Sequence, residues 1–267
     1  MMAMGRVIPG VLTASLAAGL MVYWLGKTNS ILPDPYLDEV FHVRQAQAYW
    51  DHRWRQWDPK ITTPPGLYLV SYVIAATSSM LFGKPVELSA SALRCINGLV
   101  FFNALQFIVR RFLCIRRDTL SVKEESRSSS WQLNLSALNI CLFPPIFFFS
   151  GLYYTDLAAL LIVLEAYNVD LGRSPLSNKD GTSSSSQGTT GTKYLRLISL
   201  GLAALVFRQT NIFWVAVFLG GLQVVDTLRS KSAACSSSDV WRIARSSWEL
   251  NQLFDPPANE ACFEGDT

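Results

Sequence analysis

Long apolar runs without a charged residue constrain this chain more than any other feature of its sequence. The first is Val7–Leu25, and further charge-free runs are Ile61–Gly83, Cys95–Val109 and Trp131–Thr155. A helix of about 20 apolar residues crosses a hydrocarbon core about 30 Å thick. Of the 267 residues, 50% are hydrophobic and only 16% are charged, whereas about 25% of a soluble domain is charged. The chain is therefore expected to lie in a lipid bilayer.

Helices are the expected structure of these runs, because backbone polar groups in lipid must find partners within the same segment. Two more apolar runs contain few charges: Leu157–Val169 is interrupted by Glu165, and Tyr194–Val225 is interrupted by Arg196 and Arg208. We expect an all-α, polytopic membrane bundle with roughly six or seven passes. The first run ends in bulky aromatic and aliphatic residues rather than in a small-residue cleavage site, so we expect it to remain as a signal-anchor helix.

The basic residues that follow the run Cys95–Val109 give a contradictory topology. They are Arg110, Arg111, Arg116, Arg117, Lys123 and Arg127. The positive-inside rule places them in the cytoplasm, but counting passes from a cytoplasmic N-terminus places them on the opposite side. Either one run is a re-entrant pair, or these arginines bind an anionic ligand.

Two segments are too polar to form a core. Residues 172–193 (GRSPLSNKDGTSSSSQGTTGTK) are expected to be a disordered loop, and residues 229–267 are expected to be a polar, disordered tail. Residues 1–228 are then the membrane module. The net charge of +3 is too small to indicate nucleic-acid binding, and the five cysteines lack metal-ligand spacing. We expect no metal site and no cofactor.

The loop between the first two runs, residues 26–65, is densely charged. Asp34-Pro35 predicts the start of a helix from Tyr36 to about Trp50. Such a helix would set Asp38 and His42 on one stripe and form a short amphipathic helix at the membrane surface, with its acidic stripe facing a cavity or water. The alternative is a solvated face with ordinary ion pairs. The stretch QWDPKITTPPGLYLVS, from Gln56 to Ser71, contains Asp58-Pro59 and Pro64-Pro65-Gly66, which would hold the loop in one shape.

Arg208 lies within a run that is too long for one straight crossing. Tyr194–Val225 as a single helix would be about 48 Å long, so we expect it to be tilted, or broken near Arg208-Gln-Thr-Asn211. An arginine in lipid costs about 2.5–3.5 kcal/mol even on the mildest scale, which makes it a functional candidate. Binding a lipid phosphate would offset that cost, and snorkelling to a headgroup is the alternative.

Four stretches together resemble the endoplasmic-reticulum α-1,2-glucosyltransferase family. They are YLDEVFHVRQAQAYW, WDPKITTPPGLYLVS, LYYTD (Leu152–Asp156) and FRQTNIFWV (Phe207–Val215), and the resemblance covers about residues 5–228. It implies a GT-C-like fold, a multi-pass location in the endoplasmic-reticulum membrane and a luminal catalytic loop. It also implies a dolichyl phosphate glucose donor and a diglucosylated, dolichol-diphosphate-linked oligosaccharide acceptor, which receives the third glucose for protein N-glycosylation.

The resemblance further implies an inverting transfer, because the donor glucose is β-linked and the product is α-linked. One carboxylate must accept the proton of the attacking hydroxyl, and we assign this base to Asp38. Glu39 is expected to hold the loop or a sugar hydroxyl. His42 could orient Asp38 or bind phosphate, or could be a plain surface histidine. The other substrate-binding candidates are Asp58, Asp156, Arg208, Gln209 and Asn211; Asp156 could instead only end a hairpin.

The C-terminal sequence WELNQLFDPPANEACFEGDT does not resemble a membrane segment. The family is longer, so the chain resembles a truncated or alternatively spliced product. An inactive family member that only binds partners is therefore an alternative function. A polytopic transporter or channel-associated protein is another, although it would be expected to carry inverted repeats and charges in several spans.

Overall fold

The computed structural model describes residues 4–120, 130–172, 187–231, 245 and 248–249, and the regular elements in these ranges are all helical. The expected all-α fold is thus confirmed. The chain divides into two compact units, Met1–Val215 and Ala216–Thr267, and each is described by itself. The second unit contains α10 (Leu219–Lys231), and the π-helical segment η3 (Phe213–Phe218) covers the boundary. The remaining helices belong to the first unit: α1 (Met4–Ile31), α2 (Glu39–Trp50), α3 (Gly66–Phe82), α4 (Ala90–Cys95), the π-helical segment η1 (Ile96–Phe101), α5 (Phe102–Leu120), α6 (Ser130–Cys141), α7 (Pro144–Ser150), α8 (Thr155–Leu171) and α9 (Gln187–Phe207).

Two helices in the described part of the chain are long and apolar enough to cross a membrane. They are Ile8–Ile31, with 24 residues, and the continuous helix Ala90–Arg117, with 28 residues. A third candidate is the bent pair α6–α7, whose axes differ by 69°. The bend follows from the sequence, because Pro144 and Pro145 cannot donate backbone hydrogen bonds and so begin a new helix.

The candidate spans are fewer than the six or seven that the apolar runs predicted. The later runs are divided into shorter helices, and the apolar helices Gly66–Phe82, Tyr194–Phe207 and Phe213–Val225 have only 10–17 residues. Apolar composition alone did not show these interruptions. Within the described residues, the chain is a multi-span membrane protein with two or three candidate spans by length and composition.

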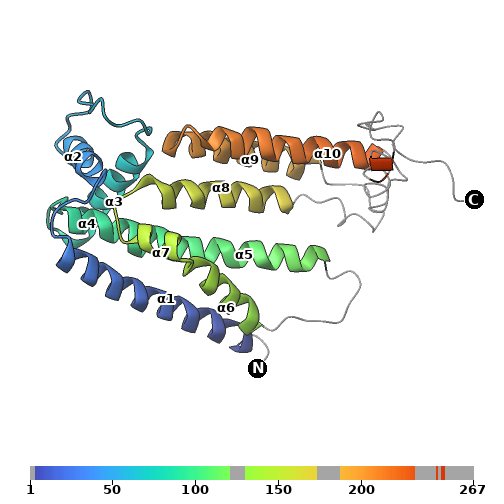
Figure 1. The fold of residues 1–267 in the computed structure, drawn as a ribbon, viewed down its shortest axis with the longest axis horizontal. Coiled ribbons are helices and arrows are strands. Elements are labelled where there is room, and N and C mark those ends of the chain that lie inside the picture. The colour runs from blue at the N-terminus through green and yellow to red at the C-terminus, as the bar shows by residue number, and fades with distance from the viewer. Residues whose placement is uncertain (1–3, 121–129, 173–186, 232–244, 246–247, 250–267) are drawn as a thin grey trace, which may run out of the picture. The chain divides into compact units, whose positions relative to one another are not determined.

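The run Ile61–Gly83 does not carry the chain away from α2. Its helix α3 packs on α2, and after α3 the chain returns, because Gln47 Nε2 of α2 donates a hydrogen bond of 2.9 Å to the carbonyl oxygen of Leu88. Figure 1 shows α2, α3 and α4 gathered at the end of the first unit where α1 ends. The expectation that this run is a membrane pass was therefore wrong.

This return removes the topological contradiction. In Figure 1 the N-terminal end of α1 and the C-terminal end of α5 lie at the same end of the first unit. Arg116 and Arg117 belong to that end of α5, whereas Lys123 and Arg127 lie outside the described residues. The basic end of α5 and the N-terminus therefore share one side, as the positive-inside rule requires of a cytoplasmic N-terminus.

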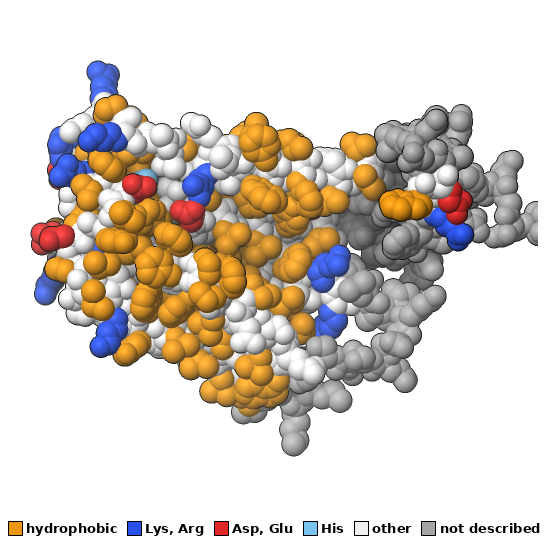
Figure 2. All heavy atoms as spheres, viewed as in Figure 1, with side chains coloured by type: hydrophobic (Ala, Val, Ile, Leu, Met, Phe, Trp, Pro, Cys, Tyr) orange, Lys and Arg blue, Asp and Glu red, His pale blue; other side chains and the backbone are white. Residues whose placement is uncertain are grey.

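The helices of the first unit expose apolar side chains along their length. Figure 2 shows hydrophobic side chains spread over the middle of the visible face, with charged side chains towards its two ends. On α1, Leu12, Leu16 and Val22 are each more than half exposed, as are Ile198 and Leu202 on α9. A continuous apolar surface of this kind indicates contact with lipid.

Part of the segment expected to be disordered, residues 172–193, is helical. Residues 173–186 lie outside the described residues, but α9 already begins at Gln187. Extending an existing helix is much easier than starting one, so the apolar segment that follows can carry polar residues into its first turns. Most of the tail, residues 229–267, lies outside the described residues.

A glycine allows α3 to approach α9 closely. A Cβ atom at Gly66 would lie 2.6 Å from the backbone oxygen of Val206. We therefore expect Gly66→Ala to destabilise the fold by about 1–3 kcal/mol, measured as a lower thermal midpoint in detergent. Gly19→Ala is the matched control, because a Cβ there has no neighbour within 4 Å; that variant is expected to be neutral or stabilising. An unchanged midpoint for Gly66→Ala would contradict the close approach.

Candidate functional site

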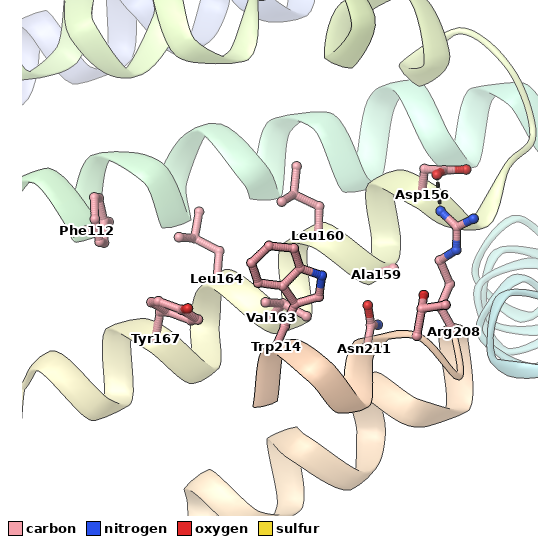
Figure 3. Close-up of a pocket in the computed structure, with 11 residues that line it drawn as sticks. Phe112, Asp156, Ala159, Leu160, Val163, Leu164, Tyr167, Arg208, Asn211 and Trp214 are labelled. Carbon is pink, nitrogen blue, oxygen red and sulfur yellow. Dashed lines mark hydrogen bonds and ion pairs between the residues drawn. The ribbon is translucent and has the colours of Figure 1, made fainter. Parts of the chain in front are cut away.

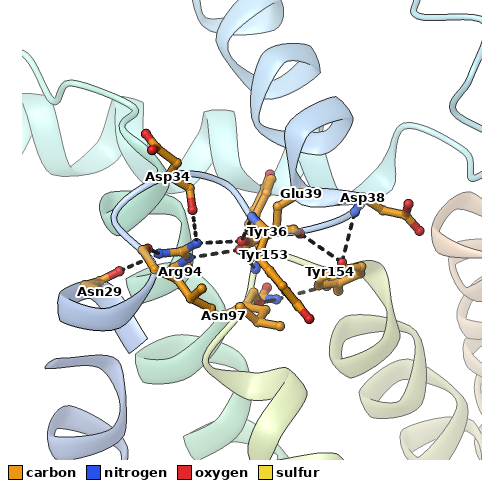
Figure 4. A network of polar contacts seen from close by, with 11 residues as sticks. Asn29, Asp34, Tyr36, Asp38, Glu39, Arg94, Asn97, Tyr153 and Tyr154 are labelled. Atoms are coloured by element: carbon orange, nitrogen blue, oxygen red, sulfur yellow. Dashed lines mark hydrogen bonds and ion pairs between the residues drawn. The ribbon is translucent and has the colours of Figure 1, made fainter. Parts of the chain in front are cut away.

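Asp38 immediately precedes α2 and is held there by its backbone. Leu37 has a positive φ of 51°, and the amide of Asp38 donates a 3.1 Å hydrogen bond to the hydroxyl of Tyr154. The Asp38 side chain makes no capping hydrogen bond with the helix, although Asp38 occupies the N-cap position. Figure 4 shows this side chain pointing away from the network that holds its backbone. The Asp38 carboxylate therefore does not stabilise the start of α2 and is left available to a ligand.

The predicted start of this helix at Tyr36 was wrong, because α2 begins at Glu39. The left-handed conformation of Leu37 interrupts the helical path. Glu39 Oε2 accepts a 2.9 Å hydrogen bond from the amide of Tyr36, which folds the chain back just before the helix. Asp34-Pro35 consequently lies outside the helix and does not cap it.

A polar cavity of about 240 Å³ lies beside Asp38. Its lining comes from the start of α2, the loop before α3, the end of α7, the start of α8 and the residue after α9: Asp38, Phe41, His42, Lys60, Ile61, Thr62, Thr63, Phe149, Tyr154, Thr155, Asp156 and Arg208. Four of the predicted site residues, Asp38, His42, Asp156 and Arg208, thus meet in one cavity. The placement of Asp38 and His42 on one stripe of the helix surface predicted the first two of these together.

An apolar cavity of about 460 Å³ adjoins the polar one, and the two share Asp156 and Arg208. It extends along α8, with walls from α5 and from the chain after α9: Phe112, Asp156, Ala159, Leu160, Val163, Leu164, Tyr167, Arg208, Thr210, Asn211 and Trp214. Figure 3 shows Asp156 and Arg208 at one end of this cavity, and Tyr167 and Phe112 at the other. One charged end and a long apolar body match an amphipathic lipid.

Arg208 and Asp156 form an ion pair where the two cavities meet. Arg208 directly follows α9, which ends at Phe207, so the predicted break near this residue is confirmed. The side-chain amide nitrogen of Asn211 donates a 2.8 Å hydrogen bond to the carbonyl of Ala204, which also accepts from the backbone amide of Arg208, so Asn211 ties the break to the last turn of α9. Asp156 lies in the first turn of α8, where the helix dipole favours a carboxylate. About 40% of each side chain remains exposed (39% and 44%), so the pair is reachable from the cavities.

His42 is buried between aromatic side chains, so the alternative of a plain surface histidine was wrong. Only 7% of the residue is exposed, and its Nδ1 lies 2.6 Å from the hydroxyl of Tyr68. Burial lowers the pKa of His42 below 6.5, although the nearby carboxylates of Asp38, Asp156 and Glu39 oppose this effect. At neutral pH the imidazole is therefore uncharged.

The buried His42 predicts a loss of stability in mild acid. The folded state disfavours the protonated imidazole, whereas the unfolded chain binds that proton at about pH 6.5. The free energy of unfolding contributed by His42 is thus fully present above pH 6.5 and falls as the pH drops towards the lower folded-state pKa. We expect the thermal midpoint of the protein to fall over this range, and a His42→Phe variant to show a shallower fall. Equal slopes would contradict the buried, neutral histidine.

Two predicted substrate-binding residues line neither cavity. Asp58 organises the loop, because its Oδ1 accepts a 3.0 Å hydrogen bond from the amide of Lys60 and its own amide donates to Gln45 Oε1. Gln209 is exposed in the break after α9. Asn211 lines the apolar cavity, but its side-chain amide nitrogen already donates to the carbonyl of Ala204.

Lys60 and Tyr154 border the polar cavity but were not among the predicted site residues. Lys60 was visible only as one more charge in the loop, although it follows the Asp58-Pro59 turn directly. Tyr154 lies in the stretch LYYTD, in which Asp156 is the one residue with a charge that indicates a site. Among the described residues, no group of three or more His, Cys, Asp or Glu side chains could hold a metal ion.

Comparison with known proteins identifies relatives for most of the chain. The Dol-P-Glc:Glc(2)Man(9)GlcNAc(2)-PP-Dol alpha-1,2-glucosyltransferase of Aspergillus fumigatus is 51% identical over 244 residues, which are 91% of this chain and 37% of the relative. Proteins with the same name from Neurospora crassa and Mus musculus are 42% and 35% identical over 81% and 79% of the chain. These matches cover 26% and 38% of those two relatives. No solved structure matches the chain significantly.

The chain thus spans roughly a third of the length of the curated relatives it matches (37% for the Aspergillus protein). Residues 32–255 match the DIE2/ALG10 family, and this range includes α2, both cavities and the break after α9. The similarity therefore covers each of the segments that line the site. The chain belongs to the DIE2/ALG10 family.

Proposed function

We propose that the protein acts as an inverting glucosyltransferase in the endoplasmic-reticulum membrane. In this function it transfers glucose from dolichyl phosphate glucose to the diglucosylated dolichol-diphosphate-linked oligosaccharide and forms the terminal α-1,2 linkage. Family membership and the names of its relatives support this substrate pair. The structural observation that carries the proposal is the meeting of a polar and an apolar cavity at Arg208 and Asp156.

The two cavities fit the two parts of the donor. The apolar cavity would take the first isoprene units of the dolichyl chain, since aliphatic and aromatic residues of α5 and α8 line it. Arg208, at the junction, would bind the phosphate through charge-assisted hydrogen bonds. The polar cavity would take the glucose and the attacking hydroxyl group of the acceptor, beside Asp38 and Lys60.

Transfer at this site needs one base and one anion-binding group. The acceptor hydroxyl oxygen attacks C1 of the glucose while the bond between C1 and the phosphate oxygen breaks. Asp38 accepts the proton of the hydroxyl, and the dolichyl phosphate leaves as an anion paired with Arg208. No acid has to protonate this leaving group, because phosphate is already a stable anion. Attack from the face opposite the phosphate converts the β-linked donor into an α-linked product.

The proposed site would face the lumen. The basic end of α5 and the N-terminus lie together, at the end of the first unit opposite to α2 (Figure 1). The positive-inside rule places that basic end in the cytoplasm. The donor lipid would then reach Arg208 from the luminal leaflet.

Expression in cells that lack this glucosyltransferase activity tests the function. We expect the chain to convert dolichol-linked oligosaccharides with two glucoses into species with three, as measured by mass profiling of the released glycans. The full-length Aspergillus fumigatus relative serves as the positive control. If the diglucosylated species persists with this chain while the relative removes it, the chain does not carry out the transfer itself.

A further inference from the structure

Arg94 is a fully buried arginine that neither cavity contains. It lies on α4, none of its surface is exposed, and it forms an ion pair with Glu39 in which both side chains are 0% exposed. Its Nε and one terminal nitrogen donate to the two carboxylate oxygens of Glu39, at 3.0 and 2.7 Å. Its other hydrogen bonds go to Asn29 Oδ1 and to the carbonyl oxygens of Leu32 and Asp34. Arg94 thus ties the end of α1 and the chain before α2 to one point on α4.

Glu39 extends these connections to the chain before α8. In addition to Arg94, its carboxylate accepts a 2.9 Å hydrogen bond from the amide of Tyr36 and a 2.6 Å hydrogen bond from the amide of Tyr153. Figure 4 shows Arg94 and Glu39 at the centre of these contacts, between the segments that carry Tyr36 and Tyr153. Both oxygens of the Glu39 carboxylate thus accept hydrogen bonds from protein donors. Glu39 lines neither cavity.

Asn97 makes a second connection from the same helix. It lies in the π-helical segment η1, directly after α4, and its amide nitrogen donates to the carbonyls of Leu152 and Tyr154 at 2.6 and 2.9 Å. The hydroxyl of Tyr154 accepts from the amide of Asp38 and donates to the carbonyl of Tyr36. π-Helical turns inside α-helices frequently occur at functional sites.

We propose that Arg94 and Asn97 are positioning residues that fix Asp38 relative to Asp156 and its partner Arg208. This inference rests on the proposed function, because it assigns the two residues to the same transfer. Arg94 holds the chain before Asp38 through Glu39, and Asn97 holds the chain two residues before Asp156 through Tyr154. The segments on the two sides of the polar cavity are therefore attached to one rigid helix, α4–η1.

A contribution to stability alone does not explain this arrangement. Burying two charges costs several kcal/mol per ion, and apolar residues of similar size are often as stable or more stable. The pair instead provides what apolar residues cannot, because it holds the amides of Tyr36 and Tyr153 and two loop carbonyls at fixed places. A misplacement of about 1 Å at a catalytic group can slow a reaction about 10²-fold.

The first test measures transfer by Arg94→Met, which removes the charge and keeps a long side chain. We expect kcat to fall about 10²-fold, while KM for dolichyl phosphate glucose stays within about threefold, since Arg94 does not touch the donor site. Arg94→Lys keeps the charge but has fewer hydrogen-bond donors, so its kcat should lie between those of the wild type and of Arg94→Met. Arg53→Met is the matched control, because Arg53 pairs with Asp51 on the exposed loop between α2 and α3. Its replacement should change neither kcat nor KM. A normal kcat for Arg94→Met, or a loss that appears only in KM, overturns the proposal.

A double variant separates positioning from stability. Arg94→Met with Glu39→Leu removes both buried charges, so its thermal midpoint should be at or above that of Arg94→Met. A pair that only stabilises the fold predicts that transfer returns together with the midpoint. The positioning role predicts that transfer stays slow, because in the double variant the amides of Tyr36 and Tyr153 lose their acceptor, the Glu39 carboxylate.

Amide hydrogen exchange tests the same proposal without requiring activity. In lipid nanodiscs, Arg94→Met should speed exchange at Tyr36 and Asp38 by at least about tenfold relative to the interior of α8. If Arg94→Met exchanges fast throughout, Arg94→Lys is measured in its place. Unchanged exchange at both amides refutes the positioning role even if the wild-type protein transfers glucose. If Arg94→Met speeds exchange at these amides but the wild-type protein does not transfer glucose, the role of Arg94 in holding these segments is retained and the proposed function is rejected.

Discussion

Replacing Asp38 with Asn is expected to slow glucosyl transfer by about 10²–10⁴-fold, the usual contribution of a positioned general base. Asn has the size and shape of Asp but cannot accept the proton of the attacking hydroxyl. The side chain does not cap α2, and the backbone amide that contacts Tyr154 is unchanged in the variant. The fold should therefore survive, and the loss should appear in kcat with both substrates saturating.

Asp51→Asn is the control for this experiment. Asp51 lies at the other end of α2, 57% of its side chain is exposed, and it pairs with Arg53 away from both cavities. Its replacement should leave kcat unchanged. Near-normal turnover by Asp38→Asn would end the assignment of Asp38 as the base, and another carboxylate of the polar cavity, Asp156, would have to be tested in its place.

Replacing Arg208 with Met is expected to weaken binding of the donor lipid. A hydrogen bond to a charged group contributes about 1.5–3 kcal/mol, so the dissociation constant for dolichyl phosphate should rise roughly 10- to 100-fold. The variant also leaves Asp156 without its cation, which adds repulsion towards a phosphate. The measurement is dolichyl phosphate binding to the protein in nanodiscs, and KM for dolichyl phosphate glucose should rise with it.

Two control variants define what Arg208 contributes. Arg208→Lys keeps the charge but loses the planar fork of donors, so its affinity should be intermediate. Arg196→Met removes another arginine of the same apolar run, which pairs with Glu165 and lines neither cavity. Unchanged affinity in Arg208→Met, or an equal loss in Arg196→Met, would contradict a phosphate site at Arg208.

The sequence predicted the parts of the site that depend on short-range patterns. The four-residue spacing from Asp38 to His42 placed both residues at one surface, and the structure brings both to the polar cavity. The excessive length of the apolar run around Arg208 predicted a break there, and α9 ends one residue before it. These predictions needed only helix geometry and the thickness of a bilayer.

Long-range pairing could not be predicted in the same way. Arg94 is separated from Glu39 by 55 residues, and nothing near Arg94 in the sequence indicates a carboxylate partner. The Asp34-Pro35 pattern misplaces the start of α2, because no local signal shows that Leu37 takes a left-handed conformation. The run Ile61–Gly83 was mistaken for a membrane pass because apolar composition does not show whether a helix crosses a bilayer or packs on a neighbouring one.

The position of Arg55 relative to the membrane tests the central claim most directly. Arg55 is exposed on the loop between α2 and α3, outside both cavities. In sealed microsomes from cells that express an Arg55→Cys variant with its native cysteines replaced, a membrane-impermeant maleimide should label this position only after the vesicles are permeabilised. That result would place the loop beside Asp38 in the lumen, where the donor phosphate and the oligosaccharide are proposed to meet. Full labelling of intact, right-side-out vesicles would place the loop in the cytosol and contradict the proposed mechanism.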